Sequence, residues 1–182
     1  MKPGQDLVVA GYAGAAGAGI AALKKQEELL QWFSAEYVEQ MQRNHVVSHS
    51  KAPYFWKDMG AADWEPAGEG GILTALWNLS GAYETGIQFD LCNIPMNQET
   101  VEVCERFDLN PYRLYSEGCT VLAADHGSQL VAKLSSLGIP AAVIGMVTTG
   151  IKREICHGDT HGYLDRPQKD QLKKIAPEFF KK

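Results

Sequence analysis

The glycine-rich stretch at residues 65–77 reads Glu65-Pro66-Ala67-Gly68-Glu69-Gly70-Gly71-Ile72-Leu73-Thr74-Ala75-Leu76-Trp77. Apolar side chains from Ile72 to Leu79 recur at the spacing of one helix face, which predicts a helix over 70–83 that begins at the glycines. The first amides of a helix lack intrahelical partners and carry the positive end of its dipole, so they suit an anion. We therefore predict that Gly68, Glu69, Gly70 and Gly71 form a phosphate- or nucleotide-binding turn. A plain turn that packs the helix closely is the alternative.

Strand and helix patterns alternate on both sides of this stretch. Strands are predicted at 7–10, 86–91, 119–124 and 141–147, with a hairpin at 151–164. Helices are predicted from about residue 20, over 24–44 with a break near Phe33-Ser34, over 97–107, over 128–137 and from 165 or 169 onward. No repeat or linker divides the chain. The pattern predicts an α/β (α+β) fold with a mixed sheet and helices packed against it.

Charge and composition exclude two classes of function. The 182 residues carry a net charge of −5, with no basic patch that would suit nucleic acid. No apolar run is long enough to span a bilayer, and the first residues do not resemble a signal peptide. We expect neither a nucleic-acid partner nor a membrane partner.

The four cysteines indicate a cytoplasmic protein with reduced thiols. They stand at 92, 104, 119 and 156, and no two form a C-x-x-C pair. Cys104 and Cys119 lie in apolar segments, which predicts small core residues rather than nucleophiles.

Six segments carry a resemblance in one register: Asp6–Val9 with the glycines after it, Glu69–Trp77, Ile94–Thr100, Asn110–Leu114, Ser116–Gly118 and Gly138–Gly145. Together they resemble the C-terminal domain of the aminoimidazole ribonucleotide synthetase superfamily. That superfamily includes selenophosphate synthetase, thiamine-monophosphate kinase and the hydrogenase maturation protein that dehydrates a carbamoylated cysteine. The hydrogenase-maturation branch and its uncharacterised relatives look most similar.

The resemblance implies a layered α/β/α domain over residues 1–182, without the N-terminal domain that supplies most ATP and magnesium ligands in complete members. It also implies that the glycine turn faces a cleft between the two halves. Pro66 and Gly68 stand where the family commonly has an aspartate and a threonine or serine, although Asp63 and Glu65 lie close by. No cysteine follows Cys156, so the cysteine-tail chemistry of the hydrogenase-maturation enzyme is not expected.

Two functions remain open at this point. One is a standalone domain, non-catalytic by itself, that binds a phosphate-containing ligand or a protein partner. The other is half of a split ATP-dependent enzyme that a separate N-terminal domain completes, with phosphoryl transfer to a carbonyl or amide oxygen as in the family. No cofactor is certain, and ATP and Mg²⁺ are expected only with such a partner domain. Self-association is a further expectation.

Other motifs favour less specific interpretations. Gly17-Ala18-Gly19 matches part of a dinucleotide fingerprint. No acidic residue follows at the end of a strand at the expected spacing, so a loop near the sheet is favoured. His157, Asp159 and His161 could bind zinc, yet a hairpin tip is the better interpretation. His45 and His49 are expected on a solvated surface. We predict no metal site and can nominate no catalytic residue.

An aromatic group precedes the glycine turn. Tyr54, Phe55, Trp56 and Trp64 form either a cluster that caps the sheet or a surface that docks another chain, and docking is slightly favoured. A bulkier residue in place of Gly70 is expected to abolish any ATP response while leaving the fold intact.

Overall fold

A seven-stranded mixed sheet organises the chain in the computed structural model, which describes residues 1–44, 53–158 and 160–181. The strand order is β2-β4-β1-β5-β3-β6-β7. The strands are β1 (Asp6–Ala10), β2 (Asp63–Pro66), β3 (Gly86–Asp90), β4 (Thr120–Ala124), β5 (Ala141–Thr148), β6 (Arg153–His157) and β7 (Thr160–Tyr163). β3 and β6 run parallel, and the other neighbouring pairs are antiparallel.

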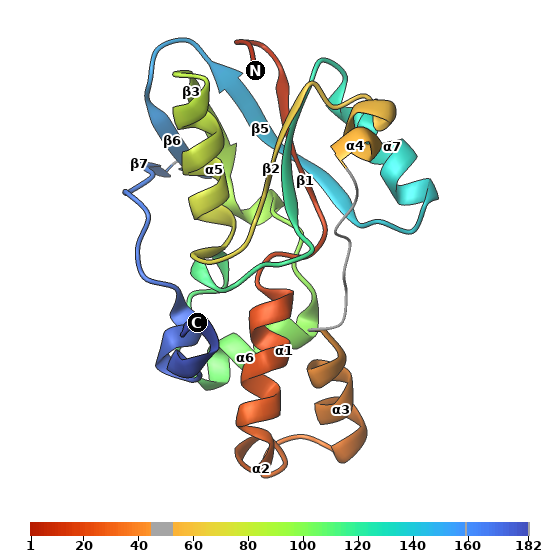
Figure 1. The fold of residues 1–182 in the computed structure, drawn as a ribbon, viewed down its shortest axis with the longest axis vertical. Coiled ribbons are helices and arrows are strands. Elements are labelled where there is room, and N and C mark those ends of the chain that lie inside the picture. The colour runs from red at the N-terminus through yellow and green to blue at the C-terminus, as the bar shows by residue number, and fades with distance from the viewer. Residues whose placement is uncertain (45–52, 159, 182) are drawn as a thin grey trace.

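Helices cover both faces of the sheet, so the predicted layered α/β/α fold with a mixed sheet is confirmed (Figure 1). α5 (Gly71–Ala82) packs on one face through a core that includes Ile72, Leu76 and Phe89. α4 (Pro53–Met59) and α7 (Gly127–Ser136) pack on the other face. Almost all apolar side chains of β1 and β4 are fully buried, because these central strands are covered on both sides.

A second group of helices lies beyond one end of the sheet (Figure 1). It contains α1 (Ala15–Lys24), α2 (Gln26–Leu29), α3 (Ala35–Arg43) and α6 (Gln98–Arg106), which share a buried core around Leu29, Met41 and Val103. Short 3₁₀ helices join it: η3 (Pro111–Arg113), η4 (Gln171–Lys174) and η5 (Pro177–Phe180). In the part of the chain that the structure describes, no helix has the length and apolarity required to cross a bilayer.

The elements differ from the predicted ones in three parts of the chain. The helix expected from about residue 20 begins at Ala15, with Gly14 in the left-handed region (φ 73°) at its N-cap. β2 and α4 lie where no element was predicted, because each has little apolar periodicity of its own. The helix expected from 165 or 169 is replaced by η4 and η5, consistent with the prolines at 167 and 177.

The aromatic group caps the sheet rather than presenting a docking surface. Trp56 is only 3% exposed and belongs to the core beneath α7, while Phe55 and Trp64 pack against the same core. Only Tyr54 of the four is largely exposed, at 77%. The docking interpretation was therefore wrong for Trp56.

The two cysteines predicted in the core are buried there. Burial raises the pKa of both Cys104 and Cys119 to about 12, whereas Cys92 is exposed. At about pH 8 we expect iodoacetamide to modify Cys92 in the native protein and to reach Cys104 and Cys119 only after unfolding in urea, since the thiolate is the reactive form. Peptide mass spectrometry with and without urea measures this, and native-state labelling of Cys119 would contradict it.

Candidate functional site

The predicted glycine turn joins β2 to α5 at the edge of the sheet. Gly70 (φ 81°) and Gly71 (φ 70°) adopt left-handed backbone conformations that other residues rarely tolerate. A Cβ on Gly71 would lie 2.5 Å from the carbonyl oxygen of Tyr112, so a second glycine is needed for close approach of η3. The sequence therefore places this turn at the start of α5, as predicted, and the turn also serves close packing.

A carboxylate from the C-terminal segment lies on this turn. The N–H of Gly70 donates to Oδ2 of Asp170 at 2.6 Å. The other oxygen, Oδ1, accepts the N–H of Leu172 at 2.8 Å and the N–H of Tyr115 at 3.2 Å. Asp170 is 2% exposed. The chain's own carboxylate thus lies at the α5 N-terminus, where the sequence predicts a phosphate.

Burial sets the protonation behaviour of this carboxyl group. It raises the pKa of Asp170 above the ordinary value, and the N–H donors of Gly70, Leu172 and Tyr115 oppose that rise. Since desolvation is the largest effect, the folded protein holds a proton on Asp170 more tightly than the unfolded chain does.

The remaining predicted site residues are partnered within the chain. The N–H of Gly71 donates to the carbonyl of Gly68 at 3.1 Å, and the same carbonyl accepts the N–H of Ser116 at 3.2 Å. Glu69 forms an ion pair with Lys173 at the surface. The structure brings the four predicted residues together, but adds Asp170 and Lys173. Reasoning from the sequence missed both because about one hundred residues separate them from the turn.

Gly70 is a poor position for the substitution test expected from the sequence. A larger residue there would have to adopt φ 81°, and its Cβ would lie 2.4 Å from the hydroxyl oxygen of Thr74. Gly68 has no positive φ, and a Cβ on it would meet nothing within 4 Å. A side chain can therefore be added to the turn at position 68 without straining the backbone.

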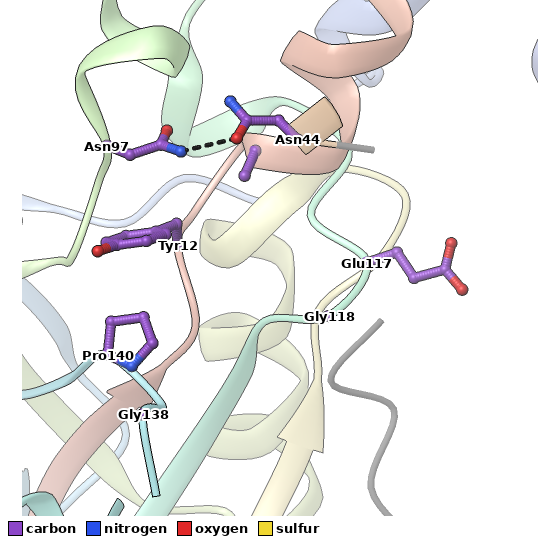
Figure 2. Close-up of a pocket in the computed structure, with 8 residues that line it drawn as sticks. Tyr12, Asn44, Asn97, Glu117, Gly118, Gly138 and Pro140 are labelled. Carbon is purple, nitrogen blue, oxygen red and sulfur yellow. Dashed lines mark hydrogen bonds between the residues drawn. The ribbon is translucent and has the colours of Figure 1, made fainter. Parts of the chain in front are cut away.

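A separate cavity of about 210 Å³ lies at the end of β1 (Figure 2). Figure 2 shows Tyr12 and Pro140 on one side and the amides of Asn44 and Asn97 on another, while the Glu117 side chain points away from them. Nδ2 of Asn97 donates to Oδ1 of Asn44 at 2.9 Å. Nδ2 of Asn44 is buried and has no hydrogen-bond partner within the described ranges. The lining contains amides rather than cations, so it suits a small neutral group better than a phosphate.

The possible dinucleotide fingerprint does not form a phosphate-binding loop. Gly17 and Gly19 lie inside α1, and the N–H of Gly17 donates to the carbonyl of Tyr115 at 2.8 Å. A Cβ on Gly17 would lie 2.6 Å from the side chain of Leu114, so this glycine permits close helix packing. The N–H of Gly14, which precedes the helix, donates to the Ser116 hydroxyl at 2.8 Å.

The predicted hairpin tip is confirmed by the pairing of β6 with β7, but its histidines find different partners. His157 contacts Cys92, and His161 contacts Cys156. Asp159, His45 and His49 lie outside the described residues.

The fold defined by this sheet and its helices is the aminoimidazole ribonucleotide synthetase-like fold, in the form of its C-terminal domain. The chain is similar in structure to E. coli HypE, a hydrogenase maturation protein, with a TM-score of 0.70 and 22% sequence identity over 96% of this chain and 53% of HypE. It is also similar to thiamine-monophosphate kinase from Stenotrophomonas maltophilia, with a TM-score of 0.64 and 15% identity over 85% of this chain and 50% of the kinase.

The likeness is one of fold. No protein-family model and no curated protein matches the chain. The chain spans about half the length of the solved structures that it resembles. The expected resemblance to the hydrogenase-maturation proteins and to thiamine-monophosphate kinase is confirmed at the level of fold.

Proposed function

We propose that this chain is a synthetase-type C-terminal domain that binds a phosphate-containing ligand at Gly68–Gly71, in competition with Asp170, and catalyses no reaction by itself. The observation that carries the proposal is the 2.6 Å hydrogen bond from the Gly70 N–H to the Asp170 carboxylate. The buried backbone N–H that donates to this carboxylate oxygen can donate to a phosphate oxygen instead.

Competition with Asp170 makes this binding weak in the isolated chain. A ligand must displace a carboxylate that already satisfies three N–H groups, and it must approach Glu69 as well. Lys173 is the nearby cation, and it is paired with Glu69. A phosphate at Gly70 would gain Lys173 as a partner only when that ion pair rearranges.

We expect millimolar inorganic phosphate or MgATP to raise the unfolding temperature of the wild-type chain. A ligand present at its own Kd stabilises the folded state by about 0.4 kcal/mol. Gly68→Val adds a side chain within the turn, where a Cβ meets nothing within 4 Å, and should remove this response. Asp170→Asn weakens the internal competitor and should enlarge the response. Differential scanning calorimetry measures both.

The matched control is Gly162→Val in β7, since a Cβ there also meets nothing within 4 Å. Its response to ligand should equal that of the wild type. If the ligand raises the unfolding temperature of Gly68→Val as much as that of the wild type, the ligand does not bind at the turn. The absence of any change in unfolding temperature in both the wild type and Asp170→Asn would contradict the proposal that the chain binds a phosphate-containing ligand.

A second candidate function is half of an ATP-dependent enzyme that another domain completes. The observation that favours it is that the chain covers only 53% of E. coli HypE, and a HypE structure has been solved in complex with ATP. In this proposal ATP and Mg²⁺ are held mainly by the other domain, and the chain contributes the face that carries the glycine turn. The chain would act in the cytoplasm, where its thiols stay reduced.

Light scattering separates these functions. Self-association of the chain alone supports a homodimer, whereas a 1:1 complex only with a separately encoded N-terminal domain supports the split enzyme. A monomer that binds phosphate and no such domain supports the first proposal alone.

A further inference from the structure

Three metal-ligating side chains meet at the end of two parallel strands. β3 and β6 pair in parallel with Asp90 opposite Cys156, so both strands end at the same edge of the sheet. η2 (Leu91–Asn93) continues directly from β3 and carries Cys92, while His157 is the last residue of β6. The parallel register therefore brings together side chains that are 65 residues apart in sequence.

The side chains of Asp90, Cys92 and His157 have the geometry of a metal site. Their ligand atoms all lie within 4.8 Å of one another, and Sγ of Cys92 lies 3.1 Å from Nδ1 of His157. Around a tetrahedral zinc ion, with bonds of about 2.0 to 2.3 Å, ligand atoms are separated by about 3.5 Å. The 3.1 Å contact and the 4.8 Å upper limit lie on either side of that value.

The backbone holds two of these ligands in place. Oδ1 of Asp90 accepts the N–H of Cys92 at 2.8 Å, which caps η2 and fixes the cysteine relative to the carboxylate. A carboxylate has a second oxygen that remains for an ion. Asp90 is half-buried, whereas Cys92 and His157 are exposed, so an ion can enter from solvent.

We propose that Asp90, Cys92 and His157 bind one Zn²⁺ ion per chain. A thiolate, an imidazole and a carboxylate together suit a borderline-soft ion, whereas Mg²⁺ prefers an octahedral set of oxygens. Three protein ligands leave a fourth position for water. The ion would connect η2 to the end of β6, so it would stabilise the position of the β6–β7 hairpin relative to the rest of the sheet. This proposal is independent of the glycine turn.

A neighbouring pair provides an internal control. Sγ of Cys156 lies 3.4 Å from Nδ1 of His161, and Nε2 of Gln88 donates to the same sulfur at 3.2 Å. This pair has the same two ligand types, but among the described residues no third metal-ligating group joins it within the same distance. Cys156→Ser therefore tests whether any cysteine–histidine pair at this end of the sheet would suffice.

The test is a titration of reduced, chelator-treated protein with Zn²⁺ by calorimetry, and with Co²⁺ by absorption, since thiolate ligation gives Co²⁺ a charge-transfer band. We expect one equivalent of each metal, no heat with Mg²⁺, and proton release on binding. Cys92→Ser and His157→Gln should each weaken Zn²⁺ binding by more than about 100-fold, beyond the effect of losing an outer-shell partner. Asp90→Asn keeps the cap of η2 and should weaken binding by at least about tenfold.

Cys156→Ser should bind Zn²⁺ as the wild type does. Circular dichroism of each metal-free variant establishes that it is folded, which is expected because Cys92 and His157 are exposed. The proposal is overturned if the wild type binds no stoichiometric Zn²⁺. It is also overturned if Cys92→Ser and His157→Gln bind as tightly as the wild type, or if Cys156→Ser loses binding and Cys92→Ser keeps it.

Discussion

Replacement of Asp170 with alanine is expected to lower the free energy of unfolding by about 3 kcal/mol or more. The substitution leaves three N–H groups, those of Gly70, Leu172 and Tyr115, without the acceptor that they share. Each buried donor that loses its partner costs about 1–3 kcal/mol, and water entering the vacated space recovers only part of this. Since a domain is stable by only about 5–15 kcal/mol, urea denaturation will detect this loss easily.

Asp165→Ala is the matched control in the same C-terminal segment. Its side chain is 74% exposed and lies 3.9 Å from Arg113, so its loss should change the free energy of unfolding by less than about 1 kcal/mol. The free energy of unfolding of Asp170→Asn should lie between those of the two variants, because the amide oxygen of asparagine can still accept an N–H. Equal stabilities of Asp170→Ala and Asp165→Ala would show that Asp170 does not hold the turn.

The pH dependence gives a second measurement of the same contact. Because burial raises the folded-state pKa of Asp170, the folded protein binds this proton more tightly than the unfolded chain. The resulting stabilisation is fully present below the unfolded pKa, near pH 4, and is lost as pH rises through the folded pKa. Wild-type stability should therefore fall across this window relative to Asp170→Asn, in which the group does not titrate.

The sequence predicted those elements whose own apolar pattern determines them. The i, i+3, i+4, i+7 spacing from Ile72 to Leu79 predicts α5, and the largely apolar run at 119–124 predicts the doubly covered strand β4. β2 could not be predicted in this way. Its first three residues are half-buried and its last, Pro66, is exposed, and they form a strand because the edge of β4 pairs with them.

The same distinction between local pattern and tertiary pairing applies to the candidate sites. A glycine cluster before an amphipathic pattern fixes where α5 starts, so the turn at Gly68–Gly71 could be predicted. The side chain that binds this turn could not be predicted, because Asp170 is distant in sequence and meets the turn only through tertiary contacts. Cys92 and His157 likewise meet only through the parallel register of β3 and β6, which depends on the whole sheet. Local sequence patterns therefore predicted positions along the chain, and the sheet topology determined the partners.

Gly145→Ala is expected to destabilise the fold by roughly 4 kcal/mol or more, through a clash between neighbouring strands. Gly145 lies in β5 where the pairing with β1 shifts register, opposite Phe89 of β3. A Cβ at this position would lie 2.0 Å from the carbonyl oxygen of Gln88 and 2.6 Å from Cα of Phe89. Both obstacles are backbone atoms, so no side-chain rotation can relieve the clash, and β3 must move away from β5.

The consequence extends across the sheet, because β6 and β7 are attached to it through β3. Separation of β3 from β5 would also expose Phe89, which is 1% exposed in the native core. Gly162→Ala in β7 is the control: a Cβ there meets nothing within 4 Å, and the exchange should be neutral or slightly stabilising. Urea denaturation measures both variants. A Gly145→Ala protein as stable as Gly162→Ala would mean that β5 and β3 are not as close at this position as the register requires.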